Sequence, residues 1–326
     1  MIDVHAHIGR CGKRRSDTLS AEQLVAKMDA WGIAQACVLP LHDNPEGWYL
    51  GNTTEEVIAA CERHPGRLIP FCLVDPRFGD NSPTTDFRDL LAEYKERGCK
   101  GLGEFLPNLL FDDPLCLNLY AQAGEAGLPV LFDMMPQLGG MYGVVDDPGL
   151  PRLEHALREC PQTVFIGHGP AFWSDISGDV RPEQRRGYPK GPILPNGAVP
   201  RLMGQYENLW ADLSAGSGHN ALTRDPAFGI EFLDRFQDKL LFGTDVLRHD
   251  QAEADVPIVG LMRRLLAEGH LTPAAHRKIV RDNAVRLLGL GVSPAREAGD
   301  PAVAQGSLRS PWATTHTPPF GGWEPG

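Results

Sequence analysis

The sequence lacks any long hydrophobic run and has little positive charge. A transmembrane helix needs roughly 18 or more consecutive apolar residues, and no such run occurs in the 326 residues. The chain starts with MIDVH, which lacks the basic and apolar segments of a signal peptide. Its 31 Lys and Arg face 42 Asp and Glu, so the net charge is −11. We therefore expect a cytoplasmic protein with no membrane or nucleic-acid partner and a small-molecule substrate.

Several motifs that define protein classes are also missing. The seven cysteines are scattered without a C-x-x-C pair, which argues against a disulfide framework and favours a reducing compartment. No phosphate-binding G-x-x-x-x-G-K-[ST] motif is present. Ser217 is not the centre of a nucleophile elbow, because Ala215 and His219 stand where that motif needs glycine. Disulfide-rich, P-loop and elbow-type serine hydrolase classes are thus excluded.

Short apolar runs bounded by Gly, Pro or Asp alternate with amphipathic segments along most of the chain. This pattern predicts strands alternating with helices. The predicted strands are residues 2–8, 36–40, 68–74, 100–105, 129–132, 163–167, 209–213 and 239–242. The predicted helices include one that starts after Ser20, then 54–63, 86–97, 115–126, 150–159, 198–206, 226–236, 256–268 and 273–288.

Eight strands that alternate with helices predict an α/β fold, a single-domain (β/α)8 TIM barrel over residues 1–290. A doubly wound open sheet is the alternative. Residues 291–326 are rich in Pro, Gly, Ser and Ala and show no period, so we expect a tail that is disordered or wraps the surface. Residues 170–197 form the longest unpatterned stretch inside the domain, and such loops are usually functional.

The motif Asp3-Val4-His5-Ala6-His7 carries the strongest chemical signal. Residues two apart in a strand point to the same face, so His5 and His7 would direct two imidazoles to one point. Two neutral imidazoles on one rigid element suit Zn, Fe, Ni or Mn. A chance H-x-H spacing is the alternative for this motif taken alone.

Four further predicted strands end in a polar side chain. These residues are Glu104, Asp133, His168 and Asp245. The C-terminal ends of barrel strands converge on one face, where the active sites of such barrels lie. An isolated acid after a strand is normally a turn or capping residue. Five strand ends with metal-ligating side chains instead favour a common site.

The segments DVHAH, FIGHG and LFGTD together resemble the amidohydrolase superfamily. They are most similar to the amidohydrolase-related branch that includes aminocarboxymuconate-semialdehyde decarboxylase. The resemblance covers residues 2–288 and implies a barrel with a divalent metal at the C-terminal strand ends. It implies that His5 and His7 bind the metal. It also implies that Asp245 is catalytic, either as a metal ligand or as the group that takes a proton from bound water.

The same resemblance gives His168 a role as a metal ligand or as a catalytic group acting on substrate. It places Glu104 where some branches have a ligand between two metals. The fifth strand departs from the family pattern, because Asp133 stands where a histidine ligand is usual. A carboxylate there would favour a harder ion such as Mn²⁺ or Mg²⁺. We expect one or two divalent ions, zinc first, with manganese or iron as the alternatives.

Other polar and aromatic residues lie near the predicted strand ends. Asp212 would orient a metal ligand or make a structural hydrogen bond. Residues that would contact substrate are Trp173, Arg185, Arg186, His219 and Arg224. Cations in loop 170–197 would reverse the negative field of the protein at the mouth of the site. An interface between copies of the chain, in a homo-oligomer, is the alternative role of this loop.

These patterns lead to three functional hypotheses. The first is a metal-dependent hydrolase for a small, carboxylate-bearing substrate, in which the metal lowers the pKa of bound water. The second is a non-oxidative decarboxylase with the same fold. The third is a catalytically silent barrel used for binding, because a fold does not determine a function. Release of carbon dioxide rather than uptake of water separates the first two.

Overall fold

The computed structural model describes residues 1–11, 17–41, 45–46 and 50–291. The predicted tail beyond residue 291 lies outside this part of the chain. Within the described residues, no helix is both long and apolar enough to cross a bilayer.

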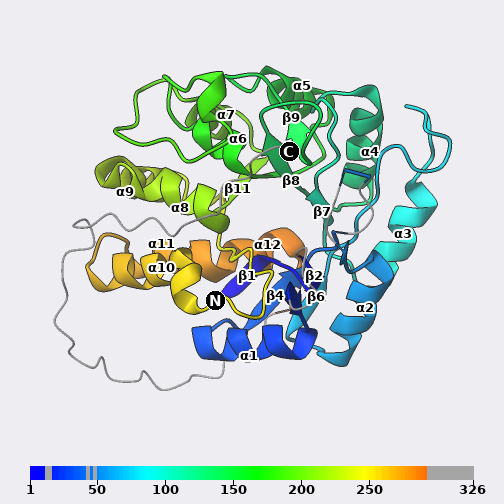
Figure 1. Cartoon of the computed structure of the whole chain (residues 1–326), viewed down its shortest axis with the longest axis horizontal. Helices are drawn as coiled ribbons and strands as arrows, with labels where there is room; N and C mark the ends of the chain where they lie inside the picture. The colour runs from blue at the N-terminus through cyan, green and yellow to red at the C-terminus, as the bar shows by residue number, and fades with distance from the viewer. Residues whose placement is uncertain (12–16, 42–44, 47–49, 292–326) are drawn as a thin grey trace. The chain divides into compact units, whose positions relative to one another are not determined.

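Eight parallel strands form the centre of the fold, with helices packed outside them (Figure 1). The strands are β1 (Ile2–Ala6), β4 (Gln35–Val38), β6 (Leu68–Pro70), β7 (Leu102–Phe105), β8 (Val130–Met135), β10 (Phe165–His168), β11 (Leu209–Asp212) and β12 (Leu240–Leu241). Each overlaps one of the eight predicted strands. Within the sheets, β1 pairs with β4 and β4 with β6, and the order β7-β8-β10-β11-β12 completes the set.

Two further contacts close these sheets into a barrel. Cys72, just after β6, forms a parallel bridge to β7, and its carbonyl accepts a 2.8 Å hydrogen bond from the N–H of Gly103. On the other side, Ala6 of β1 bridges to Val246, and the N–H of His7 donates to the Val246 carbonyl at 2.9 Å. The predicted barrel is therefore confirmed, and the open-sheet alternative is wrong.

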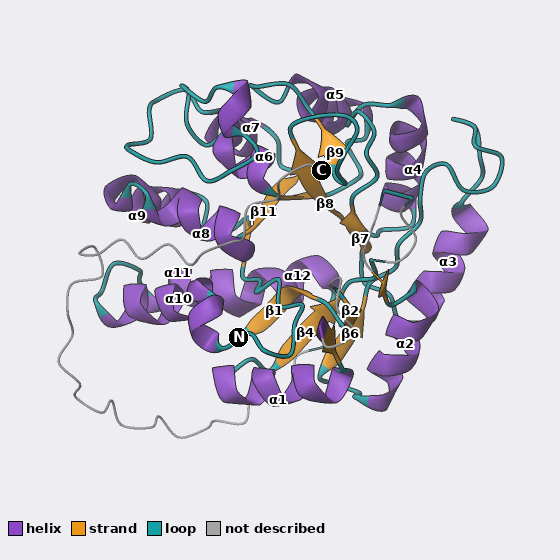
Figure 2. Ribbon diagram, viewed as in Figure 1, coloured by secondary structure: helices purple, strands orange, loops and turns teal. Residues whose placement is uncertain are grey.

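The remaining elements connect and cover these strands (Figure 2). Short strands outside the barrel are β2 (Gly9–Arg10), β3 (Thr18–Leu19), β5 (Leu50–Gly51) and β9 (Val144–Val145). The helices are α1 (Ala21–Trp31), α2 (Thr54–Arg63), α3 (Arg88–Glu96), α4 (Pro114–Glu125), α5 (Pro151–Glu159), α6 (Pro170–Ser174), α7 (Ala198–Gln205), α8 (Ala215–Thr223), α9 (Pro226–Arg235), α10 (Pro257–Ala267), α11 (Pro273–Arg277) and α12 (Asn283–Leu288). A π-helical turn, Lys278–Asp282, joins α11 to α12 where the sequence predicts one continuous helix.

Local sequence signals determine how α1 begins and ends. The Ser20 hydroxyl accepts a hydrogen bond from the N–H of Gln23, and the Gln23 side chain accepts one from the N–H of Ser20. This reciprocal capping box satisfies two N–H groups that the helix itself leaves without partners. Gly32 ends the helix in the left-handed conformation, with φ 66°, which glycine adopts without steric cost. The start after Ser20 agrees with the sequence prediction.

An apolar layer inside the barrel supports the polar strand ends. Seven barrel strands or the residues just after them contribute to one buried cluster, which includes Leu131, Ile166 and Trp210. Side chains two apart in a strand share a face. The residues two positions further along these strands therefore also point into the barrel, and they are Asp133, His168 and Asp212. The polar site thus lies above this apolar layer, at the C-terminal end of the barrel.

The loop after β10 is more ordered than its sequence predicts. Residues 170–197 contain α6 and a 3-10 turn, Pro182–Gln184. The Arg185 side chain is only 1% exposed, and its Nε donates to Asp175 Oδ2 at 2.7 Å. A second nitrogen of this guanidinium donates to the Asp146 carbonyl. This geometry does not support Arg185 as a substrate contact, because its donors are directed to Asp175, in the same loop, and to the segment after β9 instead.

Replacing Arg185 with alanine is expected to destabilise the protein by about 3–5 kcal/mol, because Asp175 would keep a buried charge without its cationic partner. Arg186 is the matched control, since the neighbouring side chain is exposed. Arg186→Ala should change the free energy of unfolding by no more than about 0.5 kcal/mol. Urea unfolding followed by circular dichroism measures both variants. Equal stability of the two variants would contradict the anchoring role.

Candidate active site

Two histidines at the end of β1 face each other. The Nε2 atoms of His5 and His7 are 3.0 Å apart, and both residues are buried. Each ring is fixed from behind by an acceptor at Nδ1. His5 Nδ1 lies 2.7 Å from Asp212 Oδ2, and His7 Nδ1 lies 3.0 Å from the Leu39 carbonyl oxygen.

These partners determine which ring nitrogens carry hydrogen. A carbonyl or carboxylate acceptor at Nδ1 requires the hydrogen there, so Nε2 carries the lone pair in each neutral ring. Two lone pairs only 3.0 Å apart repel each other unless a cation lies between them. A spacing of this size suits two ligands that each approach one metal ion at about 2.0–2.1 Å. The pair therefore fits a shared divalent ion.

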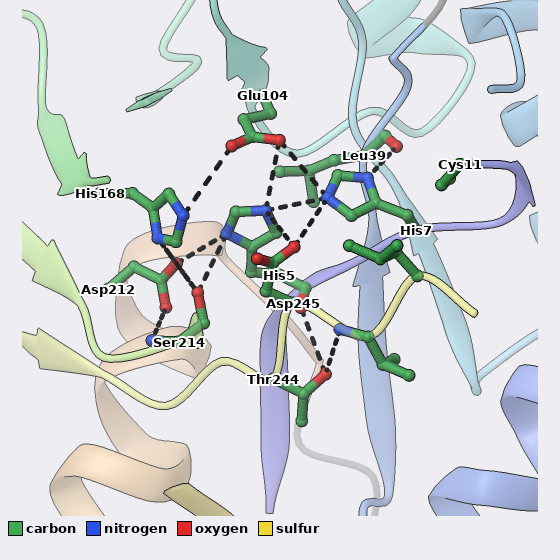
Figure 3. A network of polar contacts seen from close by, with 12 residues as sticks. His5, His7, Cys11, Leu39, Glu104, His168, Asp212, Ser214, Thr244 and Asp245 are labelled. Carbon is green, nitrogen blue, oxygen red and sulfur yellow. Dashed lines mark hydrogen bonds and ion pairs between the residues drawn. The ribbon is translucent and has the colours of Figure 1, made fainter. Parts of the chain in front are cut away.

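Two carboxylates complete this cluster (Figure 3). Glu104 Oε2, from β7, is 3.6 Å from His5 Nε2 and 3.4 Å from His7 Nε2. Asp245 Oδ1, after β12, is 3.6 and 3.3 Å from the same two atoms. The side chains of His5, His7 and Asp245 each offer a ligand atom, and these atoms lie within 4.8 Å of one another. The set His5, Glu104 and His168 meets the same criterion.

The backbone at Asp245 directs its carboxylate toward the histidines. Asp245 has φ 55°, in the left-handed region that side chains other than glycine rarely adopt. Its N–H donates to the His5 carbonyl at 2.7 Å, and the adjacent Thr244 hydroxyl donates to Asp3 Oδ2 at 2.6 Å. Such a conformation costs about 1–3 kcal/mol and persists where neighbouring contacts enforce it. Here the contacts to β1 enforce it.

Asp212 of β11 links two of the site histidines. Its Oδ2 lies 2.7 Å from His5 Nδ1 and 3.1 Å from His168 Nδ1, and it accepts a 2.5 Å hydrogen bond from the Ser214 hydroxyl. Burial alone would raise the pKa of Asp212, but hydrogen bonds from His168 and His5 hold it below its usual range. His168 Nε2 is thereby left to face Glu104 Oε1, 3.9 Å away.

The electrostatics of this cluster favour bound positive charge. Burial opposes charge on His5, yet the carboxylates of Glu104 and Asp245 raise its pKa well above the usual value. Burial also opposes charge on Glu104, but the histidines, His5 first, lower its pKa to about 2. Glu104 therefore stays ionised, and the cluster attracts a proton or a metal cation.

Asp133 lies in the same barrel interior but belongs to neither ligand set. Among the described residues, its Oδ1 has no hydrogen-bond partner although the side chain is buried. Burial, followed by the charges of Glu104 and Asp245, raises the pKa of Asp133 to about 8. Gly169 leaves room for this carboxylate, because a Cβ there would lie 2.2 Å from Oδ1. The geometry thus supports an acid beside the cluster rather than a ligand within it.

The other predicted substrate residues differ in their surroundings. Trp173 is buried, and its indole N–H donates to the Asp212 carbonyl at 3.1 Å, which is a structural contact. Arg186 is exposed on the loop after β10. His219 lies partly buried on α8, and burial lowers its pKa to about 4. Arg224 follows the same helix and is also partly buried.

The sequence patterns suggested no role for three residues of this network, although two of them, Asp3 and Thr244, lie within the DVHAH and LFGTD segments. Asp3 accepts hydrogen bonds from the His5 N–H, at 3.0 Å, and from Thr244. Its position two residues before His5, on the same strand face, is a signal that could have identified it. Ser214 and Thr244 carry no comparable pattern, because they act through contacts between segments far apart in the sequence.

Comparisons with known proteins identify the family and the fold of this chain. The family model described as Amidohydrolase matches residues 2–290. A search of curated proteins finds no match. A solved structure of a probable 2-pyrone-4,6-dicarboxylic acid hydrolase from Acinetobacter baumannii, with citric acid bound, is 15% identical. The match covers 89% of this chain and 99% of that chain, with a TM-score of 0.53.

Two further solved structures are similar over most of their length. An amidohydrolase from Burkholderia multivorans with bound HEPES is 14% identical, covers 89% of this chain and 99% of that chain, and has a TM-score of 0.57. The 2,6-dihydroxybenzoate decarboxylase from Rhizobium is 14% identical, and the match covers 88% of this chain and 99% of that chain, with a TM-score of 0.53. At these identities the structures establish the barrel fold alone. The family match over nearly the whole barrel confirms the resemblance seen in the sequence, and the chain belongs to the amidohydrolase family.

Proposed function

We propose that this protein is a metal-dependent hydrolase that acts on a small substrate bearing a carboxylate. The observation that carries the proposal is the pair of Nε2 atoms 3.0 Å apart on His5 and His7, with oxygens of Glu104 and Asp245 within 3.6 Å. Two imidazoles and two carboxylates form a mixed donor set that suits zinc, with manganese or iron as alternatives. When bound, a divalent ion would lower the pKa of a water and polarise the scissile carbonyl.

The chain's own residues suggest distinct roles around that centre. Asp245 is suited to take a proton from the attacking water, because its side chain is 21% exposed whereas those of His5 and His7 are almost fully buried. His168 is suited to contact the substrate through Nε2, since Asp212 occupies its other nitrogen. In hydrolysis the water oxygen bonds to the acyl carbon, the bond from that carbon to the leaving group breaks, and the proton held by Asp245 passes to the leaving group.

A second candidate function is non-oxidative decarboxylation, which the environment of Asp133 favours. Loss of carbon dioxide leaves a carbanion equivalent, and the reaction is completed when an acid delivers a proton to that carbon. Asp133 is buried without a hydrogen-bond partner at Oδ1 among the described residues, and its pKa is raised to about 8. A carboxyl group in such surroundings retains its proton near neutral pH. Both reactions occur among the similar structures.

The first test separates these two reactions. Metal-loaded protein is incubated in ¹⁸O-labelled water with neutral and acidic lactones, amides, and small aromatic acids, and the products are analysed by mass spectrometry. Hydrolysis should place one ¹⁸O atom in the product acid, whereas decarboxylation releases carbon dioxide and adds no ¹⁸O to the remaining product. Asp245→Asn should reduce the hydrolytic rate by about 10²–10⁴-fold, as expected for the loss of a general base. Carbon dioxide release as the only reaction would contradict the hydrolase proposal.

The second prediction concerns the metal. A His5→Ala, His7→Ala double variant is expected to lose bound metal, because it removes both rigidly oriented nitrogen ligands. Metal content per chain is measured by mass spectrometry after dialysis. His249→Ala is the matched control, since His249 is an exposed histidine after β12. Full metal occupancy in the double variant would overturn the assigned site.

The third prediction concerns Asp133. Asp133→Asn is expected to leave the metal content unchanged, because Asp133 belongs to neither ligand set. The rate of decarboxylation by the Asp133→Asn variant should fall if the Asp133 carboxyl group delivers the proton to the substrate carbon. If instead Asp133→Asn loses an ion, and Asp133→His shifts the preference toward zinc, the residue is a ligand. Metal stoichiometry with competing zinc and manganese distinguishes these outcomes.

A further inference from the structure

A tyrosine from the loop after β10 rests on the first turn of α8. A Cβ placed on Gly216 would come within 2.8 Å of the Tyr188 hydroxyl oxygen and 2.9 Å of its ring atoms Cε2 and Cζ. Gly216 therefore provides the space that the tip of this side chain occupies. Tyr188 nevertheless remains 46% exposed, so part of the side chain faces solvent. The Tyr188 side chain is therefore accessible to a ligand, and its tip is held against Gly216.

The loop holds Tyr188 from both sides. Arg185, three residues earlier, is fixed by its buried ion pair with Asp175. One residue later, the Pro189 carbonyl accepts a 3.1 Å hydrogen bond from the side-chain amide of Asn220, on α8. Contacts that fix a loop on both sides of a side chain lower the entropic cost of using that side chain to bind a ligand.

The Tyr188 hydroxyl lies beside the first turn of α8, which adjoins the candidate active site. The helix on which it rests directly follows Ser214, whose hydroxyl contacts Asp212. Burial, followed by the charges of Asp245 and Asp133, raises the pKa of Tyr188. The hydroxyl thus keeps its proton at neutral pH and is available as a hydrogen-bond donor.

The nearby cation Arg185 does not offer the same donor. Its guanidinium is directed to Asp175, in the same loop, and to the Asp146 carbonyl, just after β9. A site that contains several carboxylates repels an anionic substrate, so a donor at its edge would have a large effect on binding. Hydrogen bonds to charged groups are stronger than neutral ones.

We propose that Tyr188 determines substrate specificity, with its hydroxyl donating a hydrogen bond to a carboxylate of the substrate and Gly216 providing the space for the ring. The inference rests on the proposed function, which it deepens by assigning the group that recognises the acid. No residue of the sequence motifs suggests this role.

The test measures ligand binding separately from turnover. Metal-loaded wild-type protein is titrated calorimetrically with isophthalate, a planar dicarboxylate, and with uncharged isophthalamide. Tyr188→Phe removes only the hydroxyl and should weaken isophthalate binding by about 10–100-fold, the range expected for a hydrogen bond to a charged group. The affinity for isophthalamide should change less than threefold. Gly216→Ala, which displaces the ring, should weaken isophthalate binding in the same direction.

Leu194→Ala is the matched control, because Leu194 is an exposed side chain of the same loop. It should bind isophthalate like the wild type, and all variants should keep their metal content and melting temperature. For a substrate found by turnover, Tyr188→Phe should raise KM for the acid but not for its methyl ester.

Unchanged isophthalate affinity in Tyr188→Phe, or no binding by the wild type, would overturn the proposal. A change of oligomeric state in Tyr188→Ala, with unchanged isophthalate affinity in Tyr188→Phe, would instead assign the residue to an interface. Because these measurements need no turnover, they are independent of whether the hydrolase proposal fails. Isophthalate binding that depends on Tyr188, together with no hydrolysis of any compound, would refute the proposed function alone.

Discussion

Pairing between β1 and the residues after β12 is the contact on which the candidate site depends. The N–H of Val4 donates to the Phe242 carbonyl at 3.0 Å, and the N–H of Asp245 donates to the His5 carbonyl at 2.7 Å. These bonds close the barrel and, through the same backbone atoms, bring the Asp245 carboxylate beside the two histidines. Fold and site therefore share one set of interactions, so damage to the closure would also separate the candidate metal ligands.

Much of the barrel could be predicted because its signals are local. Short apolar runs, helical segments and the Ser20 cap each act within a few residues, and all eight strands occur where the sequence predicts them. The proximity of the His5 and His7 imidazoles could also be predicted, since the two-residue period of a strand places both rings on one face. Convergence of Glu104, His168 and Asp245 followed from the geometry of parallel barrels rather than from any local pattern.

The remaining features depend on contacts between distant segments or on weak local preference. Helix α8 begins with Ala215-Gly216-Ser217-Gly218, and glycine is a poor helix former, so its sequence does not predict a helix. As a cation in the loop beside the site, Arg185 was expected to contact the substrate. Its guanidinium instead forms a buried ion pair with Asp175 of the same loop. The support of Tyr188 by Gly216 likewise arises only after both segments have folded.

The position of Asp212 between two imidazoles has an evolutionary consequence. One carboxylate oxygen lies within 3.1 Å of both His5 Nδ1 and His168 Nδ1. A change that alters the charge of either ring changes the hydrogen bond that Asp212 can offer to the other ring. The free-energy effects of substitutions at these positions should therefore not be additive. During evolution, a substitution of either histidine would therefore need to be accompanied by a substitution of Asp212. Otherwise the protein would pass through an intermediate sequence in which one imidazole is no longer held in its orientation. Mutational paths toward new chemistry at this centre are thus constrained by epistasis within three residues.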